Sequence, residues 1–173
     1  APADATLHLA FTSDMDPPDP DTNYQVQGSN VMGAVYEGLL EYAPDSSTKF
    51  QGLLAESWTE AADGLTYTFK LRDDVSFCSG KKMTARDVVA TYERWLDPET
   101  KGLVKWRMGD VDKVTALDDV TVEYKLKKPF SELLYQMTQY FHTIVNAEQA
   151  KQLGADFGVK AFDGTGPFCM ESW

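Results

Sequence analysis

Hydrophobic and polar residues alternate without a break from Leu65 to Arg72. A period of two predicts a strand that buries one face, and the Asp63-Gly64 pair before it is typical of a tight turn. The same alternation runs through Val120–Leu126. That run follows the segment Val111–Leu117 after a two-residue break at Asp118-Asp119. The two runs therefore predict an antiparallel hairpin.

Apolar residues return at helical spacing between Thr84 and Asp97. Thr84 and Asp87 have the spacing of a capping box, in which two residues satisfy the free N–H groups at the start of a helix. The apolar residues that share one face of this predicted helix are Val88, Tyr92, Trp95 and Leu96. Because the residue before a proline disfavours the helical conformation, the helix is predicted to end where Asp97 precedes Pro98.

Two weaker patterns lie near the N-terminus. Residues 6–11 alternate between apolar and polar, which predicts another strand. An apolar stripe through Val31, Val35 and Leu39 predicts a helix, with Ser29 or Asn30 as its N-cap.

Two further helices are predicted near the C-terminus. Ser131 is a candidate N-cap for a helix buried through Leu133, Leu134 and Met137. Asn146 and Gln149 have capping spacing, and Gly154 suits the end of the helix that follows.

These elements predict an α+β fold in which helices pack on a mainly antiparallel or mixed sheet. The four large residues Trp58, Tyr67, Phe69 and Trp95 are predicted to share one core. A chain of 173 residues, 43% of them hydrophobic, can form one such core, or one domain and part of another.

Composition narrows the choice of partners. The formal net charge is −11, which disfavours nucleic acid, because phosphates need a basic surface, and also disfavours anionic lipid. No apolar stretch has the length of a membrane-spanning helix.

The sequence carries no catalytic or cofactor motif: nucleophile elbow, zinc-protease helix and phosphate-binding loop are all absent. We therefore expect a protein that is not an enzyme and has no cofactor. The two histidines and the two cysteines lie far apart, and no C-x-x-C pair occurs, so the sequence does not indicate a structural zinc site. The aspartates of Asp14–Asp21 lack the spacing of a calcium-binding loop, so we interpret this segment as a solvated acidic loop.

Six segments, in this order, carry a family resemblance. They are Tyr36-Glu37-Gly38-Leu39, Ala55-Glu56-Ser57-Trp58, Asp63–Phe69, Phe77-Cys78-Ser79-Gly80, Thr84-Ala85-Arg86-Asp87-Val88-Val89 and Gly164-Thr165-Gly166-Pro167-Phe168. The chain resembles, over about residues 24–173, the extracellular solute-binding proteins of peptide- and nickel-type ABC importers. The oligopeptide- and dipeptide-binding proteins belong to this family.

The resemblance implies the N-terminal part of a two-lobed fold like that of periplasmic binding proteins. Residues 1–36 would be the first piece of ligand-binding lobe I, residues 37–145 a small accessory α/β domain, and residues 146–173 a truncated return into lobe I. The implied function is to capture a peptide or similar small solute and deliver it to the permease subunits of the cytoplasmic membrane. The implied location is the periplasm or the outer face of the membrane, with or without a lipid anchor, and the implied state is a monomer.

The resemblance also selects candidate ligand-binding residues. In the family, the segment after the Asp-Pro loop lines the ligand cleft, which corresponds here to Tyr24, Gln25 and Val26. The Gly-Thr-Gly-Pro-Phe segment lies near the cleft, which adds Gly164, Thr165, Gly166, Pro167 and Phe168. Small-molecule sites favour such boundaries between domains. An ordinary tight turn between domains would explain the second segment equally well.

The implied compartment is oxidising, so Cys78 and Cys169 are candidates for a disulfide. A disulfide requires the two Cα atoms to lie within about 7 Å, and cysteines held apart in different lobes would remain thiols.

The alternative function is a stand-alone protein-interaction module that docks through the surface of the accessory domain. A longer reading frame would favour the importer function. Because the chain has no counterpart of the family's second lobe, we expect it to fold but to bind peptides only weakly by itself.

Overall fold

The structure is a computed structural model and describes residues 6, 8, 10–100, 102 and 105–172. Three regular helices dominate: α1 (Val26–Val35), α2 (Ala85–Leu96) and α4 (Ala147–Leu153). The strands are β1 (Leu40–Tyr42), β2 (Phe50–Gly52), β3 (Ala55–Glu60), β4 (Thr66–Leu71), β5 (Val111–Asp118) and β6 (Thr121–Leu126). The short helices are α3 (Leu133–Gln136), η1 (Pro98–Thr100), η2 (Lys105–Met108) and η3 (Gly154–Asp156).

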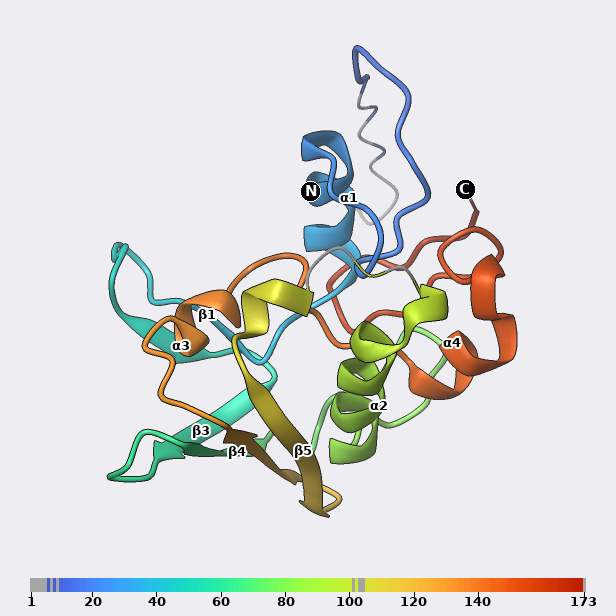
Figure 1. Cartoon of the computed structure of the whole chain (residues 1–173). Coiled ribbons are helices and arrows are strands. Elements are labelled where there is room, and N and C mark those ends of the chain that lie inside the picture. The colour runs from blue at the N-terminus through green and yellow to red at the C-terminus, as the bar shows by residue number, and fades with distance from the viewer. Residues whose placement is uncertain (1–5, 7, 9, 101, 103–104, 173) are drawn as a thin grey trace.

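The main sheet has the strand order β3-β4-β6-β5, and every neighbouring pair in it is antiparallel. β1 and β2 form a separate antiparallel pair. α2 packs across β5 and β6 on one side of the sheet, and α4 packs on α2 (Figure 1). α1 lies at the far end of the molecule from the sheet (Figure 1). The predicted α+β class is confirmed.

The clearest sequence patterns are found where they were predicted. β4 buries Tyr67, Phe69 and Leu71, and β5 and β6 form the predicted hairpin. α2 begins after Thr84, whose N–H donates to the Asp87 carboxylate at 3.0 Å, and it ends at Asp97. These elements formed as predicted because turn, cap and periodicity lie within a few residues of one another.

The large aromatic residues share one core, as predicted. Phe69 is fully buried and meets Tyr124 edge-to-face at a centroid distance of 5.6 Å. Tyr67 and Trp95 belong to the same cluster, and the partly buried Trp58 packs against it. This first cluster draws on residues from Leu39 to Ile144.

A second, smaller hydrophobic cluster lies between α1 and α4. Its buried members are Met32, Val35, Tyr36, Val145, Ala150 and Phe157. The chain passes between the two clusters twice, near Glu37 and near Ile144. The two crossings lie side by side, because the Ile144 N–H donates to the Glu37 carbonyl at 2.9 Å.

The prediction for the first helix was wrong at both ends. α1 begins at Val26, its N-cap is Gln25, and neither Ser29 nor Asn30 caps it. The backbone enters the helix early because the Asn23 side chain accepts the Gln25 N–H at 2.9 Å. The helix ends at Val35, since Tyr36 is extended, so Leu39 of the apolar stripe belongs to the first cluster instead.

Two other local predictions also need correction. Ser131 does not cap a helix: α3 is a single turn whose N-cap is Glu132. Residues 6, 8, 10 and 11 are not in a strand, and residues 7 and 9 lie outside the described part of the chain. Alternation alone does not form a strand, because a strand also needs a neighbour to accept its hydrogen bonds. By contrast, Asn146 caps α4 as predicted and accepts the Gln149 N–H at 3.3 Å.

His142 is a buried histidine at the edge of the first cluster. Its ring lies 5.1 Å from the Trp95 ring, and its Nδ1 contacts the Gln136 carbonyl. The pKa of His142 is lowered to about 4, chiefly by burial and to a smaller extent by the Arg107 charge, while the hydrogen bond with the Gln136 carbonyl opposes the decrease. His142 is therefore neutral in the folded protein at neutral pH.

Phe69→Ala should lower the free energy of unfolding by about 3–5 kcal/mol, because it leaves a cavity at a fully buried aromatic position. Urea denaturation measures the loss. Lys70→Ala, on the exposed side of the same strand, is the control and should cost less than about 1 kcal/mol. A similarly small loss for Phe69→Ala would show that the buried face of β4 was assigned backwards.

Acid should destabilise the fold through His142. His142 gains a proton below a pKa of about 6.5 in the unfolded state, but only near pH 4 in the folded state. Its contribution to the free energy of unfolding is therefore intact above pH 6.5 and is lost as the pH falls toward 4. Between pH 7 and pH 5 the loss should be about 2 kcal/mol.

Urea denaturation of a His142→Gln variant at both pH values measures that contribution, because the variant has no proton to gain at this position. The variant should lose less stability than the wild type between pH 7 and pH 5. A His8→Gln variant at an exposed site is the control and should behave as the wild type does. An unchanged pH dependence in His142→Gln would contradict the assignment.

Candidate ligand-binding site

The loop before α1 is folded around the buried side chain of Asn23. The Asn23 amide donates to the carbonyls of Asp16 at 2.8 Å and of Pro17 at 3.1 Å. The Gln25 side chain also binds the Asp16 carboxylate at 2.7 Å. With its neighbours fixed in this way, Tyr24 is directed outward, and 44% of its surface is exposed.

Two buried aspartates fix the same loop to α2. Asp19 accepts two hydrogen bonds from the Arg94 guanidinium, at 3.0 and 2.6 Å. Asp21 accepts the Trp95 indole N–H at 2.5 Å and also pairs with Arg94. One arginine thus holds two carboxylates, and the bidentate geometry sets the orientation of the loop on the helix.

The Gly164–Phe168 segment runs along the C-terminal end of α1. The Gly166 N–H donates to the Val35 carbonyl at 2.9 Å, and the Phe168 N–H donates to the Ala34 carbonyl at 3.2 Å. A Cβ atom at Gly164 would lie 2.0 Å from the Val35 oxygen. This close approach of two backbones explains why the segment needs glycine.

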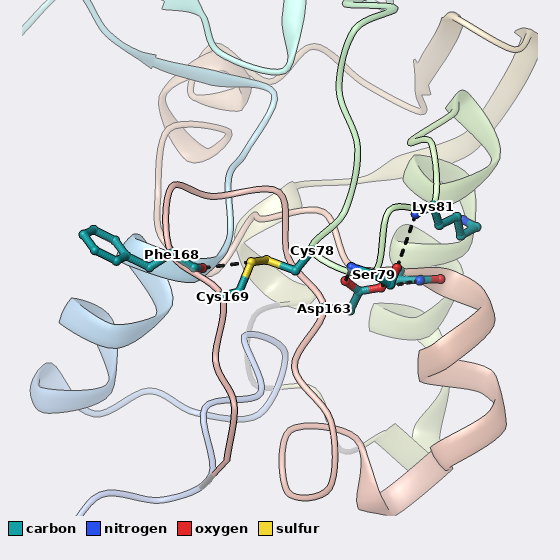
Figure 2. The surroundings of a disulfide bond; sticks show 7 residues. Cys78, Ser79, Lys81, Asp163, Phe168 and Cys169 are labelled. Carbon is teal, nitrogen blue, oxygen red and sulfur yellow. Dashed lines mark hydrogen bonds between the residues drawn. A yellow bond between two sulfur atoms is a disulfide. The ribbon is translucent and has the colours of Figure 1, made fainter. Parts of the chain in front are cut away.

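A disulfide joins this segment to the turn before α2 (Figure 2). Cys78 and Cys169 have their Cα atoms 5.8 Å apart, although 91 positions separate them in the sequence. The Cys78 N–H also donates to the Gly164 carbonyl at 2.9 Å. The Phe168 side chain points away from the disulfide (Figure 2), and 67% of its surface is exposed.

The buried carboxylate of Asp163 strengthens this connection. It accepts the Ser79 N–H at 2.8 Å, the Ser79 hydroxyl at 2.6 Å and the Asn146 side-chain amide at 2.5 Å. These three bonds bring together the turn before α2, the N-cap of α4 and the C-terminal segment. Hydrogen bonds to a charged acceptor are among the stronger ones in proteins.

The two groups of predicted ligand-binding residues lie at opposite ends of α1. Tyr24, Gln25 and Val26 are at its start, and Gly164–Phe168 is at its end, so about 13 Å of helix separates them. Val26, Pro167 and Phe168 are exposed, Gln25, Thr165 and Gly166 are half-buried, and Gly164 is buried. The structure thus places the two groups along one helix without bringing them into one pocket.

Sequence reasoning missed an aromatic cluster around Tyr24. The Tyr24 ring lies 6.4 Å from the Tyr140 ring and 5.8 Å from the Phe141 ring. The Arg107 guanidinium lies 5.3 Å from the centre of the Tyr24 ring and donates a hydrogen bond to the Tyr24 hydroxyl. Burial raises the pKa of Tyr140, with the neighbouring Tyr24 also raising it and the Arg107 charge opposing the increase.

An open depression of about 850 Å³ lies elsewhere, between the acidic loop, α2 and α4. Its charged lining includes Asp16, Glu93, Arg94 and Lys151. None of the predicted ligand-binding residues lines it.

The part of the chain that the structure describes contains no group of three or more histidine, cysteine, aspartate or glutamate side chains arranged to hold a metal ion. Three aspartates of the acidic loop, Asp16, Asp19 and Asp21, bind Arg94, Trp95 or the loop itself. The interpretation of a solvated loop is therefore wrong for Asp19 and Asp21, which are buried. Within the same described residues, no helix combines the length and the apolar character needed to cross a bilayer.

The fold and sequence define a known family. The model for the middle region of bacterial extracellular solute-binding proteins, family 5, matches residues 49–173. The chain belongs to this family.

Individual relatives agree with that assignment. The glutathione-binding protein GsiB of Escherichia coli K12 is 31% identical over 144 residues, which make up 83% of this chain and 27% of GsiB. The solved structure of MoaA from A. tumefaciens R10, in complex with mannopinic acid, has a TM-score of 0.84 and 31% identity over 92% of this chain and 33% of MoaA. The substrate-binding domain of an oligopeptide ABC transporter from Bacillus anthracis has a TM-score of 0.83 and 27% identity, over 94% of this chain and 35% of that one.

The chain therefore spans about a third or less of the length of these relatives. Two of them are described by the small solute that they bind, and the third as the substrate-binding domain of an oligopeptide ABC transporter. The alternative of a stand-alone interaction module has no support among them.

Proposed function

We propose that the chain is part of the substrate-binding component of an ABC importer, which captures a peptide or similar small solute outside the cytoplasmic membrane and delivers it to the permease. The observation that carries this proposal is the exposed wall along α1. Its two ends, Tyr24–Val26 and Gly164–Phe168, present exposed apolar side chains on a firmly fixed backbone. Family membership supplies the class of function.

The proposed division of the chain is lobe I for residues 1–36 and 146–173 and an accessory domain for residues 37–145. The two hydrophobic clusters support it, because the chain passes between them near Glu37 and Ile144. A disulfide between Cys78 and Cys169 fits an oxidising compartment, so we place the protein in the periplasm or on the outer face of the membrane. A monomeric state is part of the same proposal, with or without a lipid anchor. We assign no enzymatic activity to the protein.

One wall gives little affinity by itself. A hydrogen bond that stays open to water contributes about 0.5–1.5 kcal/mol net, whereas association costs at least about 4 kcal/mol. Effective small-molecule sites enclose most of the ligand surface. We therefore expect tight binding only in a protein that supplies a second wall.

Calorimetry with a library of di- to pentapeptides and glutathione tests the proposal. The complete protein that contains this chain should bind at least one of these solutes with a Kd below about 10 μM, whereas the 173-residue chain should bind it at least about 100-fold more weakly. Tight, salt-insensitive binding by the 173-residue chain would show that one wall suffices. A complete protein that binds none of these solutes would contradict the proposed ligand class.

A matched pair of variants locates the site in the complete protein. Phe168→Ala removes an exposed ring of the proposed wall and should weaken solute binding by about tenfold. Val159→Ala removes an exposed side chain outside that wall and should leave binding unchanged.

A further inference from the structure

Arg107 lies among aromatic rings on the short helix η2. Its guanidinium carbon is 4.5 Å from the centre of the Trp106 ring, 5.3 Å from that of Tyr24 and 4.8 Å from that of Phe141. Aromatic faces attract a guanidinium and hold its plane in a defined orientation. The cation is thus positioned by rings from three separate segments of the chain.

Arg107 has no carboxylate partner among the described residues. The other three arginines each pair with aspartate: Arg72 with Asp74, Arg86 with Asp119, and Arg94 with Asp19 and Asp21. The chain has 27 acidic residues and a net charge of −11, so acidic groups are abundant. A half-buried arginine that pairs with no described acidic residue is therefore the exception in this molecule.

Some N–H donors of the Arg107 guanidinium also lack a hydrogen-bond partner among the described residues. Within the described part of the chain its single hydrogen bond goes to the Tyr24 hydroxyl, at the protein surface. Its Nε is enclosed and makes no hydrogen bond there. Because the guanidinium is partly withdrawn from water without a counter-charge, it attracts an anion more strongly than a fully hydrated arginine does.

The neighbouring groups suit a carboxylate. The Tyr24 hydroxyl accepts the hydrogen bond from Arg107, so its own proton is free to be donated. The Trp106 side chain is 71% exposed and carries an indole N–H donor. His142, which contacts Phe141, is neutral at neutral pH and adds no second positive charge. Among the side chains that the structure describes here, one positive charge with neutral donors beside it matches a single carboxylate.

We propose that Arg107, together with Tyr24 and Trp106, binds a carboxylate group of the transported solute. This inference rests on the proposed function, and it deepens that function by naming the chemical class of the ligand: a small organic acid or a peptide with a free carboxyl end. Tyr24 connects this carboxylate site to the start of α1 and to the proposed wall.

Nuclear magnetic resonance of the ¹⁵N-labelled 173-residue chain tests the inference directly, because the enclosed Nε–H of Arg107 gives its own signal. The probes are N-acetylalanine, its neutral amide and inorganic phosphate. The acid should shift the Arg107 signal saturably with a Kd in the millimolar range, about what one charge-assisted contact on an open wall provides. The amide should not shift it.

Variants separate this site from general charge effects. Arg107→Gln should abolish the response of the Tyr24 and Trp106 signals to the acid. Arg86→Gln removes an equal charge at an arginine whose side chain is 83% exposed, and it should leave the response unchanged. Tyr24→Phe keeps the ring and removes one donor, so it should weaken binding of the acid several-fold. If Arg107→Gln does not fold, the affinity of Tyr24→Phe for the acid still tests whether the carboxylate binds at this site.

Three outcomes would overturn the inference: equal responses to the acid and the amide, no response of the Arg107 signal to the acid, or tighter binding of phosphate than of the acid. Each is distinguishable from a failure of the proposed function. A complete protein that binds peptides while its Arg107 is indifferent to carboxylates would remain a solute-binding protein, with its anion recognised elsewhere.

Discussion

The position of the C-terminal segment along α1 depends on the connection between that segment and the turn before α2. The Cys78–Cys169 disulfide makes it covalent, and the buried Asp163 carboxylate adds three hydrogen bonds from Ser79 and Asn146. The sheet and α2 belong to the first hydrophobic cluster, whereas α1 and α4 enclose the second. This connection therefore fixes the two clusters relative to each other, and with them the Gly164–Phe168 end of the wall along α1.

A second connection acts on the other end of that wall. Arg94 and Trp95 on α2 hold Asp19 and Asp21, so the acidic loop is fixed before it turns at Asn23 and presents Tyr24. A solute-binding surface gains affinity when its groups are already ordered, because less conformational entropy is lost on binding. Buried ion pairs and hydrogen bonds order the acidic loop, whereas the residues proposed to contact the ligand stay at the surface.

The sequence predicts the parts of this structure whose causes are local. The turn at Gly64, the alternation through Phe69 and the cap at Thr84 each act within a few residues, and β4, the β5–β6 hairpin and α2 formed as predicted. The start of α1 was missed because it depends on the folded loop around Asn23. The ring cluster around Arg107 was missed for a stronger reason: its members come from three distant segments, and no local pattern marks which residues will meet. The family resemblance selected Tyr24 as a candidate ligand-binding residue, but it did not select Arg107, whose charge lies beside Tyr24.

Amide hydrogen exchange of the oxidised protein and of a Cys78→Ser/Cys169→Ser variant tests the role of the connection most directly. In the variant, the Gly166 and Phe168 amides, which donate to α1, should exchange at least about tenfold faster, because the C-terminal segment loses its covalent anchor. The Phe69 amide in the middle of the sheet should keep its rate. Unchanged exchange at Gly166 and Phe168 would show that the disulfide does not hold the wall in place, and equally faster exchange at Phe69 would show that it supports the whole fold instead.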